Sequence, residues 1–442
     1  MNDFNEKFLY HIWDQQHLKS ELTLESGKTI KVLFSGHWNR GAGADFKNAI
    51  LEIDGVNIQG DVEIHINTYD WNAHNHQDDA NFNQVVLHVV YENKTSQQYT
   101  IKENGDLSEI LKINDKLSEE IQKFLETENN LHFTEHEKYC PVFSIQNEWI
   151  PRLLTEYGME RFYRKIKRFK AELSFSSFDQ LLYQGIFESL GYTNNKFPFY
   201  QLATQVPYVK IRQMIAEGYQ KMDILSLWLH TSDLINLLPS GVKTVFSNDL
   251  NESFITHKYD VSDMNFDWNL FRIRPVNHPV LRLVQVLDFI YDSVDIGLTR
   301  HILKLFSFEK DKLSVISFRR RAQLFLSKQS LKDFDTRLGS SRIDMILINI
   351  IIPIIYIYSQ KMEYEDLASY CIFLYKEFPG LSENTISNTM KKYLTEDIEQ
   401  FIHTKAVNQQ GLIQIYQTYC VNHLCDSCKN HLDAIKIKVN EE

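Results

Sequence analysis

The chain has 442 residues, of which 43% are hydrophobic and 24% are charged, as is usual for a globular protein of two or three domains. A formal net charge of −11 argues against general affinity for nucleic acids or membranes, although local basic patches can still exist. The N-terminus lacks a signal-peptide pattern, and the most apolar run, residues 345–358, is shorter than the roughly 20 residues of a membrane span, so we expect a cytoplasmic protein that contacts no membrane.

The first third of the chain has the pattern of an α/β domain, which we place at residues 1–135. A helix is predicted over residues 5–16. Strands are predicted over 22–24, 29–34, 46–53, 56–66, 85–91 and 99–102. Asp54-Gly55 lies between two alternating segments and is a strong signal for a two-residue hairpin. From Leu107 to Leu131 the apolar spacing becomes helical, which predicts a helix there.

The second strand of this hairpin carries a row of polar side chains. Period-two geometry puts Asp61, Glu63 and His65 on one face. Because such groups are costly to bury unpaired, that face should be solvated or hold a cation. Asp45 opens the partner strand and would bring another carboxylate toward Glu63. Carboxylates are the ligands that Mg²⁺ and Mn²⁺ prefer, so Asp45, Asp61 and Glu63 are predicted metal ligands.

Three further histidines follow, at His74, His76 and His88. They are possible site residues, because Mn²⁺ also accepts imidazole. The alternative is that His88 is a satisfied core histidine and that His74 and His76 belong to a solvated loop. A third interpretation is a metal hydrolase that uses these histidines on a small molecule and prefers zinc.

Residues 136–442 are dominated by helical patterns and form the larger predicted domain. The helix over residues 149–173 is basic and aromatic and is a possible surface for DNA or RNA. A loop bracketed by Pro275 and Pro279 is a possible anion site. The predicted phosphate-binding residues are Arg161, Arg164, Lys165, Arg168, Arg272 and Arg274. The alternatives are a solvated basic helix face and loop arginines paired with carboxylates.

The tail contains three closely spaced cysteines, Cys420, Cys425 and Cys428, with His423 and His431 beside them. Three thiols with a nearby histidine suit a tetrahedral zinc site. The same thiols could hold an iron–sulfur cluster if a distant fourth thiol joined them, and Cys140 is the candidate. Cysteines without metal are the alternative.

The residues around the hairpin resemble the PD-(D/E)xK nuclease core. Ala44-Asp45 stands where that core has Pro-Asp, and Glu63-Ile64-His65 stands where it has Glu-x-Lys. The resemblance implies a restriction-endonuclease-like domain in which Asp45 and Glu63 hold Mg²⁺ or Mn²⁺ and His65, in place of lysine, positions the attacking water. It implies a phosphodiesterase acting on DNA or RNA, with a non-catalytic nucleic-acid-binding protein or scaffold as the alternative. Some such exonucleases also join one remote cysteine to a C-terminal cysteine cluster.

The whole chain also resembles a bacterial family known only as a domain of unknown function. The segments that carry this resemblance are GAGADF, GDVEIH, VVLHVV, LGYTNNKFPF, RIRPVNHP and QGLIQIYQTYC. It implies no activity, so the function has to be argued from the site.

Overall fold

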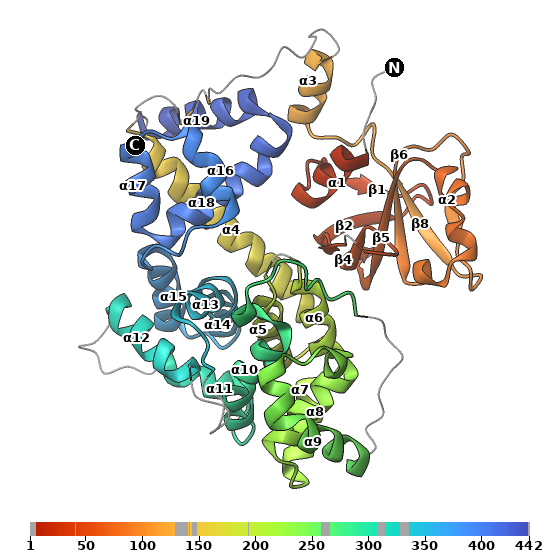
Figure 1. The fold of residues 1–442 in the computed structure, drawn as a ribbon. Coiled ribbons are helices and arrows are strands. Elements are labelled where there is room, and N and C mark those ends of the chain that lie inside the picture. Colours follow the sequence, from red (N-terminus) through yellow and green to blue (C-terminus); the bar gives the residue numbers. More distant parts are fainter. Residues whose placement is uncertain are drawn as a thin grey trace. The chain divides into compact units, whose positions relative to one another are not determined.

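The computed structural model describes residues 6–39, 41–128, 140, 142–143, 148–192, 194–257, 266–306, 314–327 and 336–440. Contacts divide the chain into two units (Figure 1). The sheet unit comprises residues 1–174, 383–402 and 408–442. The helical unit comprises residues 175–382 and 403–407.

The sheet unit contains all the strands that the structure describes, together with helices from both ends of the chain. Its elements are α1 (Glu6–Gln15), β1 (Leu22–Thr23), β2 (Thr29–Phe34), β3 (His37–Trp38), β4 (Phe46–Ile53), β5 (Val56–Asn67), α2 (Asp70–Ala73), β6 (Val85–Glu92), β7 (Tyr99–Ile101), β8 (Leu107–Lys112), α3 (Glu119–Glu128), α4 (Ile150–Glu172), α16 (Thr385–Met390), α17 (Glu396–Thr404), α18 (Ala406–Thr418) and α19 (Cys425–Asn440). The last residues of α17 and the first of α18 belong to the helical unit.

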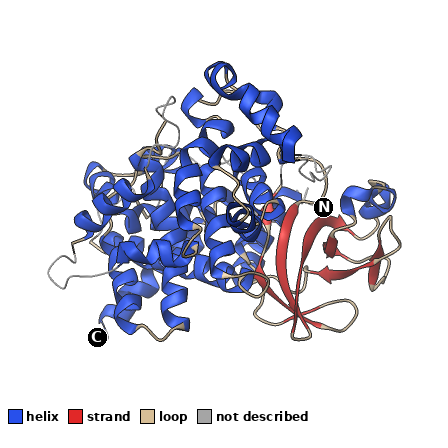
Figure 2. Cartoon of the chain, turned by 90° about the horizontal axis from the view of Figure 1, so that it is seen from below, coloured by secondary structure: helices blue, strands red, loops and turns tan. Residues whose placement is uncertain are grey.

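The strands form one mixed sheet (Figure 2). Their order is β1-β2-β4-β5-β6-β8-β7, with β3 paired to β4. The strands from β1 to β5 pair antiparallel, whereas β5-β6 and β6-β8 are parallel. The predicted hairpin is confirmed, since Asp54 and Gly55 join β4 to β5 with φ angles of 48° and 81°. A parallel neighbour requires a crossover, and the segment carrying α2 provides it between β5 and β6.

Different groups of residues pack against the two faces of the sheet. Val62 and Ile64 of β5 belong to the main core, together with Ile12 and Trp13 of α1. On the crossover side a smaller apolar group forms around Trp71 of α2, whose indole N–H donates to the carbonyl oxygen of Ile101 at 3.1 Å. Because side chains alternate along a strand, Glu63 and His65 point away from the face that Val62 and Ile64 share. The polar residues of β5 are therefore held on the crossover side.

The predicted helix over residues 107–131 is wrong in its first part. Residues 107–112 form β8, parallel to β6, and within the described part of this range, which ends at residue 128, the helix covers residues 119–128. Ser108 is buried and its hydroxyl donates to the carbonyl oxygen of Val85 at 2.7 Å. Ile110 and Leu111 are adjacent and both buried, because the sheet is covered on both faces at this point. Because side chains on both faces are buried, the segment lacks the alternation of apolar and polar residues by which a strand is recognised.

Gly60 allows β5 to approach the segment before β6. A Cβ atom there would collide with the Val86 side chain and lie 2.8 Å from the carbonyl oxygen of Gln84. We therefore expect Gly60→Ala to lower the free energy of unfolding by about 1–3 kcal/mol through overpacking. Thermal melts should show this against Gly339→Ala, where the added methyl group meets no atom within 4 Å. Equal melting temperatures for the two variants would contradict the tight approach.

The helical unit contains helices and connecting turns among its described residues. Its helices are α5 (Phe178–Leu190), α6 (Lys196–Gln205), α7 (Tyr208–Ala216), α8 (Lys221–Thr231), α9 (Ser240–His257), α10 (Pro279–Ser293), α11 (Leu298–Leu303), α12 (Val315–Leu326), α13 (Ser340–Ile346), α14 (Ile352–Lys361) and α15 (Glu365–Glu377). A mixed sheet in the N-terminal region and a mostly helical remainder are thus confirmed. The predicted domain boundary at residue 135 lies outside the described residues and stays a prediction.

One helical run among the described residues, Ser340–Lys361, is long and apolar enough to cross a membrane. It comprises α13, a π-helical turn at Leu347–Ile351, and α14. Within its most apolar window, 72% is buried inside the protein, which is typical of a core helix. The apolar run at residues 345–358 thus lies within this mostly buried helical run.

Candidate metal centre

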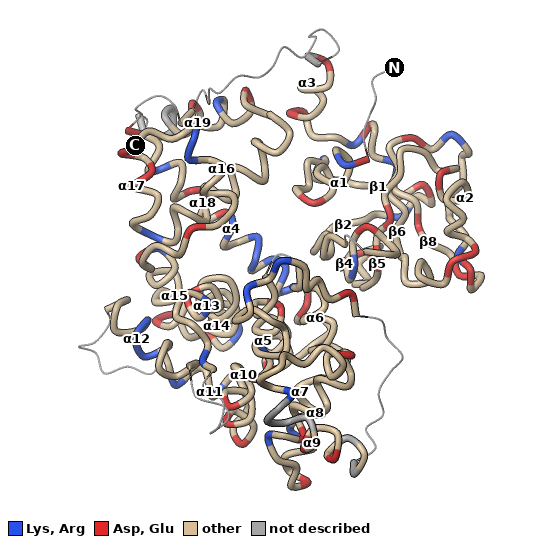
Figure 3. Tube along the Cα trace, viewed as in Figure 1, with Lys and Arg blue, Asp and Glu red and all other residues tan. Residues whose placement is uncertain are grey.

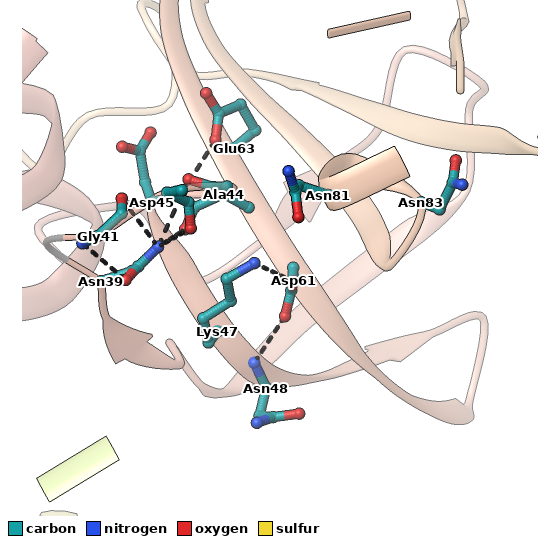
Figure 4. A network of polar contacts seen from close by, with 12 residues as sticks. Asn39, Gly41, Ala44, Asp45, Lys47, Asn48, Asp61, Glu63, Asn81 and Asn83 are labelled. Carbon is teal, nitrogen blue, oxygen red and sulfur yellow. Dashed lines mark hydrogen bonds and ion pairs between the residues drawn. The ribbon is translucent and has the colours of Figure 1, made fainter. Parts of the chain in front are cut away.

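Asp45 and Glu63 meet where β4 and β5 pair. Phe46 lies opposite Val62, which sets Asp45 beside Glu63 on the neighbouring strand. The Asp45 amide N–H donates to Glu63 Oε2 at 3.0 Å (Figure 4). The Ile64 amide N–H donates to Asp45 Oδ2 at 3.0 Å. Each carboxylate is thus held by a backbone amide of the other strand, and the two are brought together as the hairpin predicts.

Two imidazoles lie beside the other oxygen of Glu63, and a third lies beside one of them. Glu63 Oε1 lies 3.4 Å from His65 Nε2 and 3.3 Å from His76 Nε2. His74 Nδ1 lies 3.1 Å from His65 Nε2. One nitrogen of each of the three histidines lies within 4.8 Å of the other two. His65 and His76 are buried and partly buried, whereas His74 is exposed, so the cluster opens to solvent at His74.

His88 supports this cluster from inside the protein. Its Nε2 lies 2.9 Å from His65 Nδ1, and its Nδ1 lies 2.9 Å from the Thr100 hydroxyl oxygen. If His65 Nε2 binds an ion, its proton must be on Nδ1, from which it is donated to His88 Nε2. The remaining proton of His88 is then donated to Thr100. This chain of hydrogen bonds fixes the His65 tautomer in the way that partners of metal-bound histidines generally do.

Burial disfavours the charged forms of both carboxylates. It raises the pKa of Asp45 to about 7, and the neighbouring charge of Glu63 adds to the shift. Burial likewise raises the pKa of Glu63 to about 8, against the opposing hydrogen bond from the Asp45 amide. Tyr10 of α1 is hydrogen-bonded to Asp45, and burial together with that carboxylate raises the pKa of its hydroxyl. Without a cation, this pair is therefore partly protonated near neutral pH.

Burial favours the neutral form of His65, His76 and His88. Burial lowers the pKa of His65 to about 2, with a further contribution from the neighbouring histidines. Burial also lowers the pKa of His88 to about 3 and shifts that of His76 downward. Neutral imidazoles have a free lone pair on one nitrogen, which is the state that binds a metal ion. The protein thus presents nitrogen donors that do not have to lose a proton.

Asp61 is not brought to this cluster. Its carboxylate accepts from Lys47 Nζ at 2.8 Å and from the Asn48 amide at 3.0 Å (Figure 4). Asn48 has a φ of 55°, at the irregularity where the β4-β5 pairing shifts between Phe46 and Ala49. Lys47 also counteracts the pKa increase of Glu63 by its positive charge. The carboxylate of Asp61 thus already forms an ion pair with Lys47. The carboxylates of Glu63 and Asp45 instead accept hydrogen bonds from backbone amides.

The predicted basic residues have contacts of their own. Lys and Arg recur along α4 (Figure 3). Within the sheet unit, Arg161 contacts Gln410 and Gln417, Arg164 contacts Gln15 and the carbonyl of Asp14, Lys165 contacts Gln410, and Arg168 contacts Glu172 and the Phe34 ring. Arg272 and Arg274 are exposed in the helical unit, on the predicted irregular loop. Nucleic-acid binding by these residues stays a prediction.

The second predicted site comprises Cys140 and the three tail cysteines, all of which belong to the sheet unit. The side chains of Cys140, Cys420 and Cys428 pack with the main core of the sheet unit. His431 packs its ring against Tyr157, with 4.9 Å between ring centroids. His423 follows the short turn that Cys420 opens, with a φ of 55°.

Comparison with known proteins places the sequence in a family. A family model described as Protein of unknown function (DUF2851) matches residues 6–384. The chain belongs to this family. The match ends before the tail, so residues 410–420 and the three tail cysteines lie beyond it. No curated protein and no solved structure matches the chain, and the resemblance to the PD-(D/E)xK core stays a prediction.

Sequence reasoning missed Lys47 and Tyr10, which both act on the acidic pair. Lys47 stands two residues after Asp45, so alternation along β4 would have indicated its direction. Tyr10 is on α1, and no local pattern links that helix to the start of β4.

Proposed function

We propose that the chain is a divalent-metal-dependent phosphodiesterase acting on DNA or RNA. Its ion would be held by Glu63 and by His65, His74 and His76, with Asp45 beside it. The observation that carries this proposal is the spacing of the donor atoms. Glu63 Oε1 lies 3.4 Å from His65 Nε2 and 3.3 Å from His76 Nε2, and His65 Nε2 lies 3.1 Å from His74 Nδ1.

This spacing fits donors that share one ion. Imidazole and carboxylate donors bind at about 2.1 Å from a divalent transition metal, which sets adjacent donors roughly 3.0–3.4 Å apart in octahedral or tetrahedral geometry. A carboxylate with three imidazoles suits Mn²⁺ or Zn²⁺ better than Mg²⁺, because Mg²⁺ prefers oxygen ligands. We therefore favour Mn²⁺ over Mg²⁺, and His65 acts as a ligand rather than as the residue that orients water.

The arrangement of charges supports phosphodiester chemistry. Asp45 immediately precedes β4, Glu63 lies on the neighbouring strand β5, and Lys47 adds a positive charge near Glu63. In the Glu-x-Lys pattern, a lysine at the position of His65 would supply this positive charge. Here Lys47 on the neighbouring strand β4 would supply it instead. An ion at this site would lower the pKa of a bound water and offset charge on the scissile phosphate. Asp45, whose amide donates to Glu63, is the carboxylate that would accept a proton from the attacking water.

A hydrolase of small molecules is the second candidate. The three imidazoles favour it, since such a donor set is usual for zinc. It would prefer Zn²⁺ and would need no polymeric substrate.

The test uses the full chain after removal of metals by a chelator. Mn²⁺, Mg²⁺ and Zn²⁺ are added separately, with double-stranded DNA, single-stranded DNA, RNA and bis(p-nitrophenyl) phosphate as substrates. We expect Mn²⁺-dependent cleavage of at least one polymer and weaker activity with Mg²⁺. Zinc-dependent hydrolysis of the small ester with intact polymers would favour the second candidate. Absence of both metal binding and cleavage would favour a scaffold protein.

A further inference from the structure

Two arginines are buried in the helical unit, and neither has a carboxylate partner among the described residues. Arg282 of α10 is 3% exposed and Arg342 of α13 is 9% exposed. Asp288 and Asp344, the buried acidic residues of the same two helices, pair with other cations instead. Because a guanidinium stays charged at neutral pH, two positive charges are enclosed here without a counter-charge from the described part of the chain.

Both guanidiniums lie around one aromatic side chain. Tyr192 follows α5, and its ring centroid lies 3.7 Å from the guanidinium carbon of Arg342 and 5.6 Å from that of Arg282. The Tyr192 hydroxyl also accepts from a terminal N–H of Arg282 at 3.3 Å. Tyr192 itself is 47% exposed. The two arginines therefore form one group, and this group lies directly beneath the surface of the helical unit.

The other hydrogen bonds of the two guanidiniums are to neutral oxygen atoms. Arg282 donates to the side-chain oxygen atoms of Asn277 at 2.6 Å and of Gln285 at 2.8 Å. Arg342 donates to the carbonyl oxygen of Ser189 at 2.8 Å. These bonds fix the positions of both guanidiniums, but neutral acceptors leave both charges uncompensated.

Three buried nitrogen atoms of this region have no hydrogen-bond partner among the described residues. They are Nε of Arg282, Nε of Arg342 and Nδ1 of His278. His278 lies one turn before Arg282 on the same helix face, and its carbonyl oxygen accepts from the Arg282 amide at 3.1 Å. Buried donors are rarely left without an acceptor. An anion bound here would satisfy the guanidinium N–H groups and their charges together.

Repulsion between the two arginines is not offset elsewhere in the group. Burial lowers the pKa of Arg282 to about 10, and the neighbouring charge of Arg342 adds to this shift. Arg319 shows the usual arrangement, since its Nε and a terminal nitrogen donate to the Asp344 carboxylate at 3.0 and 2.6 Å. Enclosing two like charges is costly unless a negative charge joins them. The group is therefore complete only with an anion.

Charge and donor geometry favour a phosphate group as this anion. Guanidiniums bind phosphate oxygen atoms through paired N–H groups. A phosphate monoester carries nearly two negative charges near neutral pH, which matches two guanidiniums, whereas a phosphodiester or a carboxylate carries one. Two segments noted in the sequence, LGYTNNKFPF and RIRPVNHP, supply Tyr192 and Asn277 to the group.

We propose that Arg282 and Arg342, together with Tyr192, bind a phosphate dianion, either free or as the end group of a phosphate monoester. This site differs from the loop predicted to bind anions, because Arg272 and Arg274 of that loop are exposed. The proposal does not depend on the proposed phosphodiesterase activity, whose residues belong to the sheet unit.

The test is equilibrium dialysis of the full chain with radioactive inorganic phosphate, at about pH 7.5 and constant ionic strength in chloride. A chelator is present, so that no metal at the acidic site can bind the phosphate. We expect about one phosphate per chain. Displacement by phenyl phosphate would show that a monoester is accepted, and its failure to displace would assign the site to free phosphate. Absence of binding, or equal displacement by the singly charged dimethyl phosphate, would overturn the proposal.

Variants assign the binding to the two arginines. Arg342→Lys keeps the charge but loses the paired donors, and Arg282→Met removes a charge while keeping most of the side-chain length, so each should weaken phosphate binding at least about tenfold. Without phosphate, Arg282→Met should melt at or above wild type, because one uncompensated charge is gone. The control Arg272→Met should bind phosphate like wild type. Unchanged binding in folded Arg342→Lys would contradict the proposal, even if Arg282→Met did not fold.

Carboxylates of the chain itself are the competing partners. The sequence has Asp333 and Asp335 shortly before Thr336, outside the described residues, and Thr336 Oγ1 accepts from Gln285 Nε2 at 2.8 Å. Replacing both aspartates by asparagine should leave phosphate binding unchanged. If this double variant binds phosphate and wild type does not, these carboxylates are the partners of the arginines and the proposal is wrong.

Discussion

Glu63→Gln should abolish Mn²⁺-dependent cleavage, lowering it by at least about a hundredfold, and should remove the stabilisation of the protein by Mn²⁺. Glutamine keeps the shape of the side chain and can still accept from the Asp45 amide through its carbonyl oxygen. It removes the negative charge that faces His65 and His76. For wild-type protein, Mn²⁺ at about a hundred times its dissociation constant adds roughly 2.7 kcal/mol to the free energy of unfolding.

The matched control is Glu52→Gln. Glu52 lies on β4, which pairs with β5. Its carboxylate accepts from Lys31 Nζ at 2.6 Å in a solvent-exposed contact. Cleavage and the Mn²⁺-dependent melting shift should be unchanged in this variant. If instead Glu63→Gln melts far below wild type and wild type ignores Mn²⁺, then Glu63 has a structural role and the metal assignment is wrong.

Without metal, Asp45 and Glu63 should contribute less to the free energy of unfolding as the pH rises from about 4 to about 8, whereas the buried histidines His65 and His88, whose pKa values are lowered, act in the opposite direction below about pH 6.5. Asp45 and Glu63 have folded-state pKa values of about 7 and about 8, above their ordinary values near 4. A carboxyl whose pKa is raised by folding binds its proton more tightly in the folded state. Its contribution is therefore fully present below the unfolded pKa and is lost as the pH rises through the folded pKa.

Mn²⁺ should remove this pH dependence above neutral pH, because a bound cation stabilises the ionised carboxylates. Each pKa unit corresponds to about 1.4 kcal/mol, so the effect should be visible as a melting temperature lower by several degrees. Melting curves from pH 4 to 8.5, with a chelator or with Mn²⁺, measure it. Glu63→Gln without metal should melt above wild type at pH 8 and close to it at pH 4. Parallel wild-type curves with and without Mn²⁺ would contradict the prediction.

Much of the acidic half of the site could be predicted from sequence, because it follows from local rules. Asp54-Gly55 is a two-residue turn with both φ angles positive, and this sets the register of the hairpin near the turn. Alternation along β5 then separates Glu63 and His65 from Val62 and Ile64. Asp45 comes beside Glu63 only because the pairing shifts between Phe46 and Ala49, and no sequence pattern predicts this irregularity.

The rest of the site depends on contacts that no local pattern describes. His74 and His76 belong to an irregular crossover segment, and the position of His76 is set by its stacking on Phe82, with 3.7 Å between ring centroids. The structure does not favour the prediction that Asp61 binds the metal, because Lys47 from the neighbouring strand neutralises the Asp61 carboxylate. The strand at residues 107–112 was missed for the same kind of reason, since its pairing with β6 and its burial are tertiary features.

A crystal structure of the protein soaked with Mn²⁺, with the ion located by its anomalous scattering, tests the central claim most directly. We expect one ion about 2.1–2.2 Å from Glu63 Oε1 and from the nitrogen atoms of His65 and His76, with His74 or Asp45 completing its coordination. Anomalous density elsewhere, with Glu63 still in contact with two unmetallated imidazoles at millimolar Mn²⁺, would contradict the claim.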